Sequence, residues 1–393
     1  MTQVTDAATA AVASAVTEAP AVSEASSGAA APVFDRIPHP APASPERVAE
    51  VLADPGFGKY VTDHMVTIEH TRERGWHGAS VRPYEALALA PTASVLHYGQ
   101  AIFEGLKVYR QPDGSVAAFR PDANARRFQA SARRLAMPEL PEELFLESMR
   151  ELLARDARWV PDGAGRSLYL RPLMIATSTE LTVAAATEYL YVLMAMPAGS
   201  YFTGGVKPVS VWLSEDHVRA AAGGTGAVKA AANYAGTLAP QRLAAEHGCD
   251  QVVWLDAVER RWVEEMGAMN LFFVFGSGPT ARLVTPQLSG SLLPGVTRDS
   301  ILTLARDLGY GVEERRISVE EWEKAAESGE LTEVFACGTA ATITPVGTVK
   351  HAAGEFLVNG GAPGPVAQRV RDQLVALHEG VAEDRHGWLH RLT

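Results

Sequence analysis

The spacing of the hydrophobic residues changes along this chain, and that change limits the folds open to it. In the first part short apolar runs alternate with polar residues, and LKVYR and SVAAF flank the turn sequence QPDG. This pattern predicts strands and a hairpin. From Asp122 the sequence DANARRFQASARRLAM places Phe128, Ala132 and Leu135 on one helical face, with Asp122 as the expected N-cap. Apolar strand runs return after a second amphipathic helix, PEELFLESMRELLARDARWV.

The second half of the chain repeats this mixture, with no internal repeat of fixed period. We interpret VSVWLS, QVVWLD, RRWVEEM and NLFFVFG as strands, EVFACGTAATITPV as one strand broken by Gly338, and YAGTLAPQRLAAEHG, TRDSILTLARDLG and PVAQRVRDQLVALHEG as helices. Elements mixed in this way predict an α+β fold. We expect a disordered tail over residues 1–45, a small α+β domain over 46–197, an interdomain loop over 198–205 and a larger domain over 206–393.

Composition is typical of an ordinary globular protein and argues against several kinds of partner. The chain has 393 residues, 47% of them hydrophobic, and a formal net charge of −11, so we expect neither nucleic acid nor a membrane as a partner. No apolar run approaches the roughly 20 residues of a membrane helix, and the first 45 residues lack the pattern of a secretory signal. Cys249 and Cys337 make no CxxC pair, so we expect reduced thiols and a cytoplasmic location.

One lysine stands alone in a stretch of small residues. Ala220 to Thr237 reads AAAGGTGAVKAAANYAGT, and Lys229 is its only charged side chain. In a dry site desolvation would lower the pKa of this lysine and make it a nucleophile that can form a Schiff base with a carbonyl. The alternative is a surface lysine in a flexible Gly/Ala loop, and these residues alone leave both interpretations open.

If Lys229 carries an aldehyde cofactor, pyridoxal 5'-phosphate is the leading candidate, and it needs further groups around its ring. Tyr234 lies five residues further on and could donate to an oxygen near the lysine. Glu264 and Glu265 follow a strand in WVEEMGAMN, and alternation turns only one of them inward, where it could hold the ring nitrogen protonated. A packed aromatic ring and a solvated glutamate pair are the alternatives for these residues.

The phosphate of such a cofactor has three candidate contacts. Residues 294–297, PGVT, lie immediately before an amphipathic helix, whose free N–H groups and dipole favour a bound phosphate. The turn CGTAAT could add backbone donors from Gly338, Thr339 and Ala340, and Arg127 could supply a counter-charge. A capped helix and a solvated basic face are the corresponding structural alternatives.

Other common motifs are missing. GGTGAVK has no GK[ST] ending and follows no strand as GxGxxG would, EHGCD has no second ligand pair for zinc, and no GxSxG occurs. We therefore expect no dinucleotide site, no metal site and no serine nucleophile elbow.

Nine blocks of the sequence, in order, resemble the branched-chain amino acid aminotransferases, which belong to the class IV family of pyridoxal-phosphate enzymes of fold type IV. The resemblance runs from about Phe57 to near the C-terminus, through FGKYVTDHM, HYGQAIFEGLKVYR, RPDANARRFQASA, SLYLRP, GSYFTGG, AVKAAANYAG, VEEMGAMN, SLLPGVTR and EVFACGTAA. It implies a two-domain fold like that of D-amino acid aminotransferase, with a small α/β domain and a larger, mixed, β-barrel-like domain.

The resemblance also implies a role for each candidate residue. Lys229 would anchor the cofactor as a Schiff base and carry a proton between the substrate Cα and the cofactor. Tyr234 would contact the phenolate oxygen and Glu265 the ring nitrogen. The phosphate would be held by Arg127, Val296, Thr297 and Thr339. The substrate pocket would be formed by Tyr98, Phe103, Tyr169, Arg171, Tyr201, Thr339 and Ala340.

The implied activity is transamination between the branched-chain L-amino acids Leu, Ile and Val and 2-oxoglutarate, which gives branched-chain 2-oxo acids and L-glutamate. The segment around Val183 matches a loop that reaches a partner subunit in relatives, so the resemblance implies a homodimer. A D-amino acid transaminase, an aminodeoxychorismate lyase and a non-catalytic pyridoxal-phosphate-binding protein are the alternatives.

The sequence departs from the pattern of relatives in two ways. Ala268 stands where some relatives have threonine, which removes one hydroxyl near the phosphate. Ala341 and Thr344 stand where mammalian enzymes have a redox CxxC, so we expect no thiol switch there.

Overall fold

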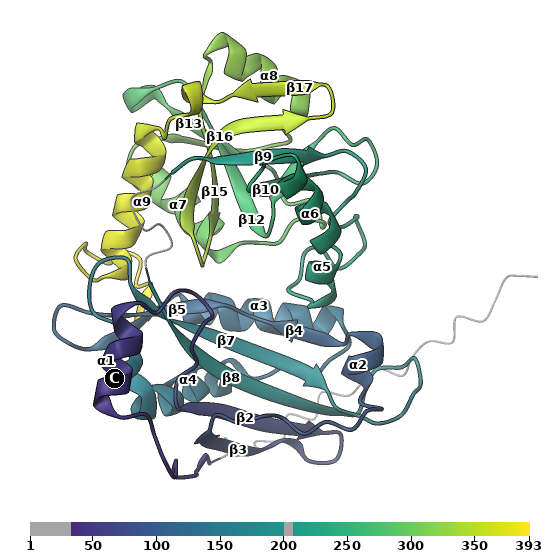
Figure 1. The fold of residues 1–393 in the computed structure, drawn as a ribbon, viewed down its shortest axis with the longest axis vertical. Helices are drawn as coiled ribbons and strands as arrows, with labels where there is room; N and C mark the ends of the chain where they lie inside the picture. Colours follow the sequence, from purple (N-terminus) through teal and green to yellow (C-terminus); the bar gives the residue numbers. More distant parts are fainter. Residues whose placement is uncertain (1–32, 200–206) are drawn as a thin grey trace, which may run out of the picture. The chain divides into compact units, whose positions relative to one another are not determined.

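The computed structural model describes residues 33–199 and 207–393, and within them two large sheets organise the chain (Figure 1). The first sheet has the order β1-β3-β2-β8-β7-β5-β6-β18, with β4 paired to β7, and only β1 and β3 pair in parallel. Its strands are β1 (Asp35–Arg36), β2 (His64–Thr71), β3 (Gly75–Pro83), β4 (Ala101–Phe103), β5 (Leu106–Arg110), β6 (Val116–Phe119), β7 (Ser167–Ala176), β8 (Glu188–Ala198) and β18 (Leu389–Arg391).

The second sheet closes on itself. Its order is β11-β10-β9-β16-β15-β12-β13-β14, β17 pairs with β16, and β11 also pairs with β12, so six strands from β11 to β12 form a closed ring. Its strands are β9 (Val209–Ser214), β10 (Gln251–Leu255), β11 (Val263–Met266), β12 (Met269–Phe275), β13 (Arg282–Thr285), β14 (Gly311–Glu314), β15 (Leu331–Gly338), β16 (Thr342–His351) and β17 (Gly354–Leu357). The expected barrel-like second half is confirmed.

Helices cover both sheets (Figure 1). In the first half α3 and α4 pack against each other and against the sheet, with Phe128, Phe145 and Met149 in its core. In the second half α7 and α9 share a core with β12 and β15. The helices are α1 (Pro45–Ala53), α2 (Ser94–Tyr98), α3 (Pro121–Arg134), α4 (Glu142–Asp156), α5 (Ala232–Ala235), α6 (Leu238–Glu246), α7 (Val296–Asp307), α8 (Val319–Ser328) and α9 (Pro365–His378), with short 3₁₀ turns at Ala157–Trp159, Gly278–Thr280 and Asn359–Gly361.

The start of α3 differs from the expectation. The N-cap is Arg120 in a left-handed conformation, and Pro121 is the first helical residue, so Asp122 lies inside the first turn. Proline favours this first position because its fixed φ suits a helix and its missing N–H has no partner to lose. Asp122 instead forms an ion pair with Arg126, one helical turn further on.

The segment EVFACGTAATITPV is a hairpin rather than one broken strand. β15 and β16 pair antiparallel, with Gly338 opposite Thr342. Thr342 has φ +63, in the left-handed region, and this conformation accompanies the reversal of the chain. The turn between the two strands therefore contains Thr339 and Ala340, two of the predicted site residues.

The ends of the chain take part in the first sheet more than the sequence indicates. Of the predicted tail, residues 33–45 are ordered in the structure, because β1 pairs with β3 and Phe34, 8% exposed, joins the core. At the other end β18 pairs with β6. The sheet changes between Ala198, which ends β8, and Val209, which begins β9; the domain limits themselves remain a prediction, and most of the expected interdomain loop lies outside the described residues. No helix in the two described ranges is long and apolar enough to cross a membrane.

Candidate active site

Lys229 is held against the first sheet by backbone contacts on both sides. Its carbonyl accepts from the Phe103 N–H at 3.1 Å, and Ala230 forms an isolated bridge with Ile102 in β4. Its own N–H donates to the Ser131 hydroxyl in α3 at 3.0 Å. Lys229 is half-buried, which differs from both the fully dry site and the free surface loop considered from sequence.

The side chain of Lys229 points toward two aromatic residues. Its Nζ donates to the hydroxyl of Tyr234, on α5, at 3.0 Å and lies 4.8 Å from the centre of the Phe103 ring. The rings of Phe103 and Tyr234 are themselves 4.8 Å apart. Asn233 stabilises the loop just before Lys229, because its side-chain amide donates to the carbonyls of Thr225 and Val228. Tyr234 is therefore a contact of the lysine and not only a packed ring.

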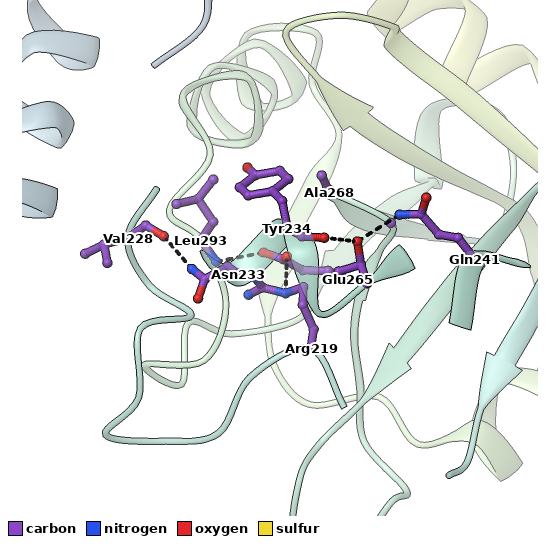
Figure 2. A pocket seen from close by; sticks show the side chains of 10 residues that line it. Arg219, Val228, Asn233, Tyr234, Gln241, Glu265, Ala268 and Leu293 are labelled. Carbon is purple, nitrogen blue, oxygen red and sulfur yellow. Dashed lines mark hydrogen bonds and ion pairs between the residues drawn. The ribbon is translucent and has the colours of Figure 1, made fainter. Parts of the chain in front are cut away.

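Glu265 is a buried carboxylate with three partners. It lies on β11, and its Oε2 is 2.8 Å from Nε of Arg219, while its Oε1 accepts from the Leu293 N–H at 2.7 Å and from Asn270 at 3.3 Å. Burial raises the pKa of Glu265 to about 7, against the opposing effect of Arg219. Figure 2 shows Arg219 and Glu265 meeting beside Tyr234 in a pocket that Ala268 also lines.

Glu264 faces elsewhere. Strand alternation puts its side chain on the opposite side of β11 from Glu265, where it lines a different cavity. Glu264 is 5% exposed and Glu265 is 2% exposed, so the solvated glutamate pair considered from sequence is wrong.

The N-terminus of α7 is open in the way a phosphate site requires. The helix begins at Val296 after Gly295. The first N–H groups of an α-helix have no partner within the helix, and here no side chain caps them. A Cβ on Gly295 would overlap the amide oxygen of Asn270. Val296 and Thr297 line one cavity together with Thr339, from the turn after β15.

The same cavity is lined by a buried lysine that sequence reasoning missed. Lys107, on β5, donates to the carbonyl of Ala340 at 2.8 Å and so braces the Thr339–Ala340 turn. Burial lowers the pKa of Lys107 to about 8. The one signal in the sequence was a charged residue at the second position of an otherwise apolar strand run, LKVYR.

Arg127 is paired and largely buried rather than part of a solvated basic face. Two of its nitrogens donate to Glu104 at 2.7 and 2.8 Å, and its third donates to the Pro294 carbonyl at 3.1 Å, next to the start of α7. Ser131 links it to the lysine, because the Ser131 hydroxyl donates to the Arg127 carbonyl at 2.9 Å. Sequence reasoning missed Glu104 and Ser131, since both act through contacts with distant segments.

Three of the predicted substrate residues meet on the first sheet. Arg171, on β7, donates to the Tyr169 hydroxyl at 3.1 Å and lies 4.8 Å from the centre of the Phe103 ring. A Cβ on Gly105 would overlap the Tyr169 hydroxyl, so glycine leaves room for this tyrosine. Tyr98, on α2, is 41% exposed and makes no hydrogen bond or ring contact with these three in the described residues, and Tyr201 lies outside the described residues.

Lys229 and Tyr234 lie in the segment between the barrel strands β9 and β10, and the buried Glu265 lies on the barrel strand β11. The model of the family "amino-transferase class IV" matches residues 101–349, and the chain belongs to that family. In the described residues no cluster of His, Cys, Asp and Glu could hold a metal ion.

The relatives narrow the family further. The chain is 63% identical over 344 residues to the branched-chain-amino-acid aminotransferase of Mycolicibacterium smegmatis. The matched region covers 87% of this chain and 94% of that protein. It is similar in fold to the branched-chain amino acid aminotransferase of Escherichia coli, with a TM-score of 0.70, 27% identity and coverage of 84% and 99%. Another branched-chain amino acid aminotransferase, solved with pyridoxamine 5'-phosphate, has a TM-score of 0.69 and 26% identity to this chain. The match covers 85% of this chain and 100% of that one. Within its class the chain thus groups with the branched-chain-amino-acid aminotransferases.

Proposed function

We propose that this enzyme catalyses transamination between branched-chain L-amino acids and 2-oxoglutarate, with pyridoxal 5'-phosphate held at Lys229. The observation that carries the proposal is the contact between Nζ of Lys229 and the hydroxyl of Tyr234. Tyr234 in turn lines a pocket together with the buried Glu265. The names of the relatives support the substrate class.

The residues present fit this cofactor. Arg127 and the open first turn of α7 suit a phosphate, and Gly295 leaves a cradle that a Cβ would disturb. Glu265 suits a ring N–H, because Arg219 and the Leu293 N–H stabilise its charged form. Bound pyridoxal phosphate would supply an electron sink that allows the Cα–H bond of an amino acid to break.

The chain's own residues would then handle protons and orientation. Lys229 Nζ would take the proton from the substrate Cα and pass it to the cofactor. An amine must be neutral to accept this proton. The Tyr234 hydroxyl, 3.0 Å away, would hold Nζ in position. The Thr339–Ala340 turn, braced by Lys107, would present backbone N–H groups to the substrate carboxylate.

The pocket walls support a branched apolar substrate with limited selectivity. Phe103 and Tyr169 provide apolar surface, and one buried methylene contributes only about 0.8 kcal/mol, so Leu, Ile and Val would be similar substrates. Arg171 beside Tyr169 is the candidate for the second carboxylate of glutamate and 2-oxoglutarate.

We further propose a homodimer and a cytoplasmic location. The start of α2 contacts the loop after β7, because the Ser94 N–H and hydroxyl both donate to the Ser178 carbonyl. Exposed apolar side chains lie on both segments: Leu96 and Tyr98 on α2, and Leu181 and Val183 on the loop after β7. A second copy of the chain would cover this surface and bring Tyr98 near a substrate. Both cysteines are free and buried, which suits a reducing compartment.

Product analysis tests the substrate assignment. The purified enzyme with L-leucine and 2-oxoglutarate should form L-glutamate and a branched-chain 2-oxo acid. Formation of product from D-alanine, or of pyruvate from aminodeoxychorismate, with no reaction of L-leucine would point to the two alternatives of the same fold.

A further inference from the structure

Arg120, just before α3, has a backbone conformation that an arginine rarely adopts. Its φ and ψ are both 48°, in the left-handed region. A residue with a side chain keeps such a conformation only where its surroundings fix it, and residues of this kind gather at functional sites. The C-terminal segment supplies part of that support. The Arg120 N–H donates to the Trp388 carbonyl at 2.8 Å, and its guanidinium carbon lies 5.0 Å from the centre of the Trp388 ring.

The Arg120 side chain also reaches the start of α7. Its Nη1 donates to the Ser300 hydroxyl at 2.8 Å, and its Nη2 is 2.7 Å from the Asp299 carboxylate. Ser300 is fully buried, and its hydroxyl donates in turn to the Val296 carbonyl at 2.8 Å. Val296 is the first residue of α7 and one of the predicted phosphate contacts. Two hydrogen bonds in series therefore connect Arg120 to the predicted phosphate site.

The two parts of that phosphate site come from different helices, which have to be aligned. Arg127 is on α3, and the first N–H groups of α7 are the other expected contacts. Arg127 donates to the carbonyl of Pro294, two residues before α7 begins, at 3.1 Å. Arg120 contacts the helix itself, through Asp299 and Ser300. Arg120 thus fixes the first turn of α7 relative to the α3 helix that carries Arg127.

Arg120 also offsets a charge that would oppose a phosphate. Asp299 is an acidic residue in the first turn of α7. A carboxylate there interacts with the same helix dipole as a bound phosphate and repels the phosphate. The ion pair with Arg120 compensates for this repulsion. Loss of the guanidinium would therefore both release the first turn and leave the charge of Asp299 unbalanced.

We propose that Arg120 is a positioning residue for the cofactor phosphate, which acts through Ser300 and Asp299 on the first turn of α7. The guanidinium holds these two residues and does not need to contact the cofactor. This role rests on the proposed function, because it concerns the phosphate of the same cofactor.

Equilibrium dialysis of the full-length, cofactor-free protein against pyridoxal 5'-phosphate and against pyridoxal tests this role. Pyridoxal lacks the phosphate, so a residue that positions the phosphate should affect only the first ligand. Arg120→Asn suits the left-handed conformation, but its side chain is too short to reach α7. Its affinity for pyridoxal phosphate should fall roughly ten-fold or more, with an unchanged affinity for pyridoxal. Arg110→Gln is the control, because it removes an ion pair with Asp162, outside α7, and should keep both affinities.

Equal losses for both ligands in Arg120→Asn would show that Arg120 only supports the fold and would overturn the proposal. An unchanged affinity for pyridoxal phosphate would also overturn it. Ser300→Ala removes one hydroxyl and keeps the test decisive if Arg120→Asn does not fold. It should weaken the binding of pyridoxal phosphate and not that of pyridoxal, and no change would overturn the connection through Val296. A wild-type protein that does not bind pyridoxal phosphate would instead overturn the proposed function, and this role with it.

Discussion

Arg219 and Glu265 form an ion pair of 2.8 Å in which neither side chain is more than 7% exposed. The arginine lies at the start of the Lys229 segment, and the glutamate lies on β11, so the pair ties the lysine loop to the barrel. Arg219 also donates to the carbonyls of Gly226 and Ser291. A buried pair of this kind sets how easily the carboxylate ionises and therefore how well it can hold a protonated ring nitrogen.

The raised pKa of Glu265 should make the stability of the cofactor-free protein depend on pH. Its pKa is about 7 in the folded chain and about 4.3 when unfolded, so the folded state holds the proton more tightly. Its stabilising contribution is complete below about pH 4.3 and is lost as the pH rises through 7. Between pH 5 and 8, wild type should lose about 2–3 kcal/mol more unfolding free energy than Glu265→Gln.

Urea unfolding at the two pH values measures this difference. Glu355→Gln, which changes an exposed carboxylate, should keep the wild-type pH dependence. Equal losses in wild type and Glu265→Gln would show that Glu265 does not titrate between these values.

Ser131 connects the lysine to the arginine, and removing its hydroxyl should affect both. Ser131→Ala leaves the Lys229 N–H without its acceptor in a fully buried place, which should cost about 1–3 kcal/mol of stability. It should also weaken pyridoxal phosphate binding, measured by equilibrium dialysis. Ser148→Ala is the matched control, because Ser148 is equally buried but contacts Phe145 and Tyr191 instead. If both variants keep wild-type cofactor affinity, Ser131 only supports the fold.

Gly295 should tolerate no side chain. The Cβ of Gly295→Ala would overlap the amide oxygen of Asn270, whose nitrogen donates to Glu265 and to the Leu293 carbonyl. We expect a loss of about 1–3 kcal/mol in stability and weaker cofactor binding. Gly236→Ala serves as the control, because nothing lies near its Cβ and its φ of −65 suits alanine. Thermal unfolding with and without pyridoxal phosphate compares the two, and equal behaviour would contradict the cradle.

Arg171 should matter more for the dicarboxylic substrate than for leucine. Arg171→Leu removes the guanidinium beside Tyr169 and Phe103, so KM for 2-oxoglutarate should rise roughly ten-fold or more while KM for L-leucine changes less. Steady-state kinetics with each substrate varied in turn measures the two values. Arg150→Leu, at an exposed i,i+3 ion pair, is the control. A larger effect on leucine than on 2-oxoglutarate would reverse the assignment.

Local sequence patterns were sufficient for some of the fold and not for the rest. The strand runs of the barrel and the face of α3 that carries Phe128 follow from hydrophobic spacing. CGTAAT was expected to be a turn, but the reversal of the chain there into two antiparallel strands was missed, because an apolar run looks the same whether it is one strand or two. The pairing of β18 with β6 joins segments about 270 residues apart, which no local pattern encodes.

Some residues of the site could likewise be predicted from the sequence, and others could not. Lys229, Tyr234 and Glu265 could be proposed because a cofactor needs those groups and the order of the family motifs distinguishes Glu265 from Glu264. Arg219, Ser131, Glu104 and Lys107 could not, because each acts through a partner that is distant in sequence, as Lys107 does with Ala340. Their roles follow only from three-dimensional contacts.

The absorbance of the purified protein, before and after L-leucine is added, tests the central claim most directly. With pyridoxal phosphate supplied, wild type should show a visible band that shifts when leucine is added, and Lys229→Ala should be unable to complete transamination. The Lys229→Ala variant should keep its fold, because its backbone contacts with Phe103 and Ser131 do not involve the side chain. A wild-type protein without such a band, or a Lys229→Ala variant that still forms glutamate at the wild-type rate, would contradict the account.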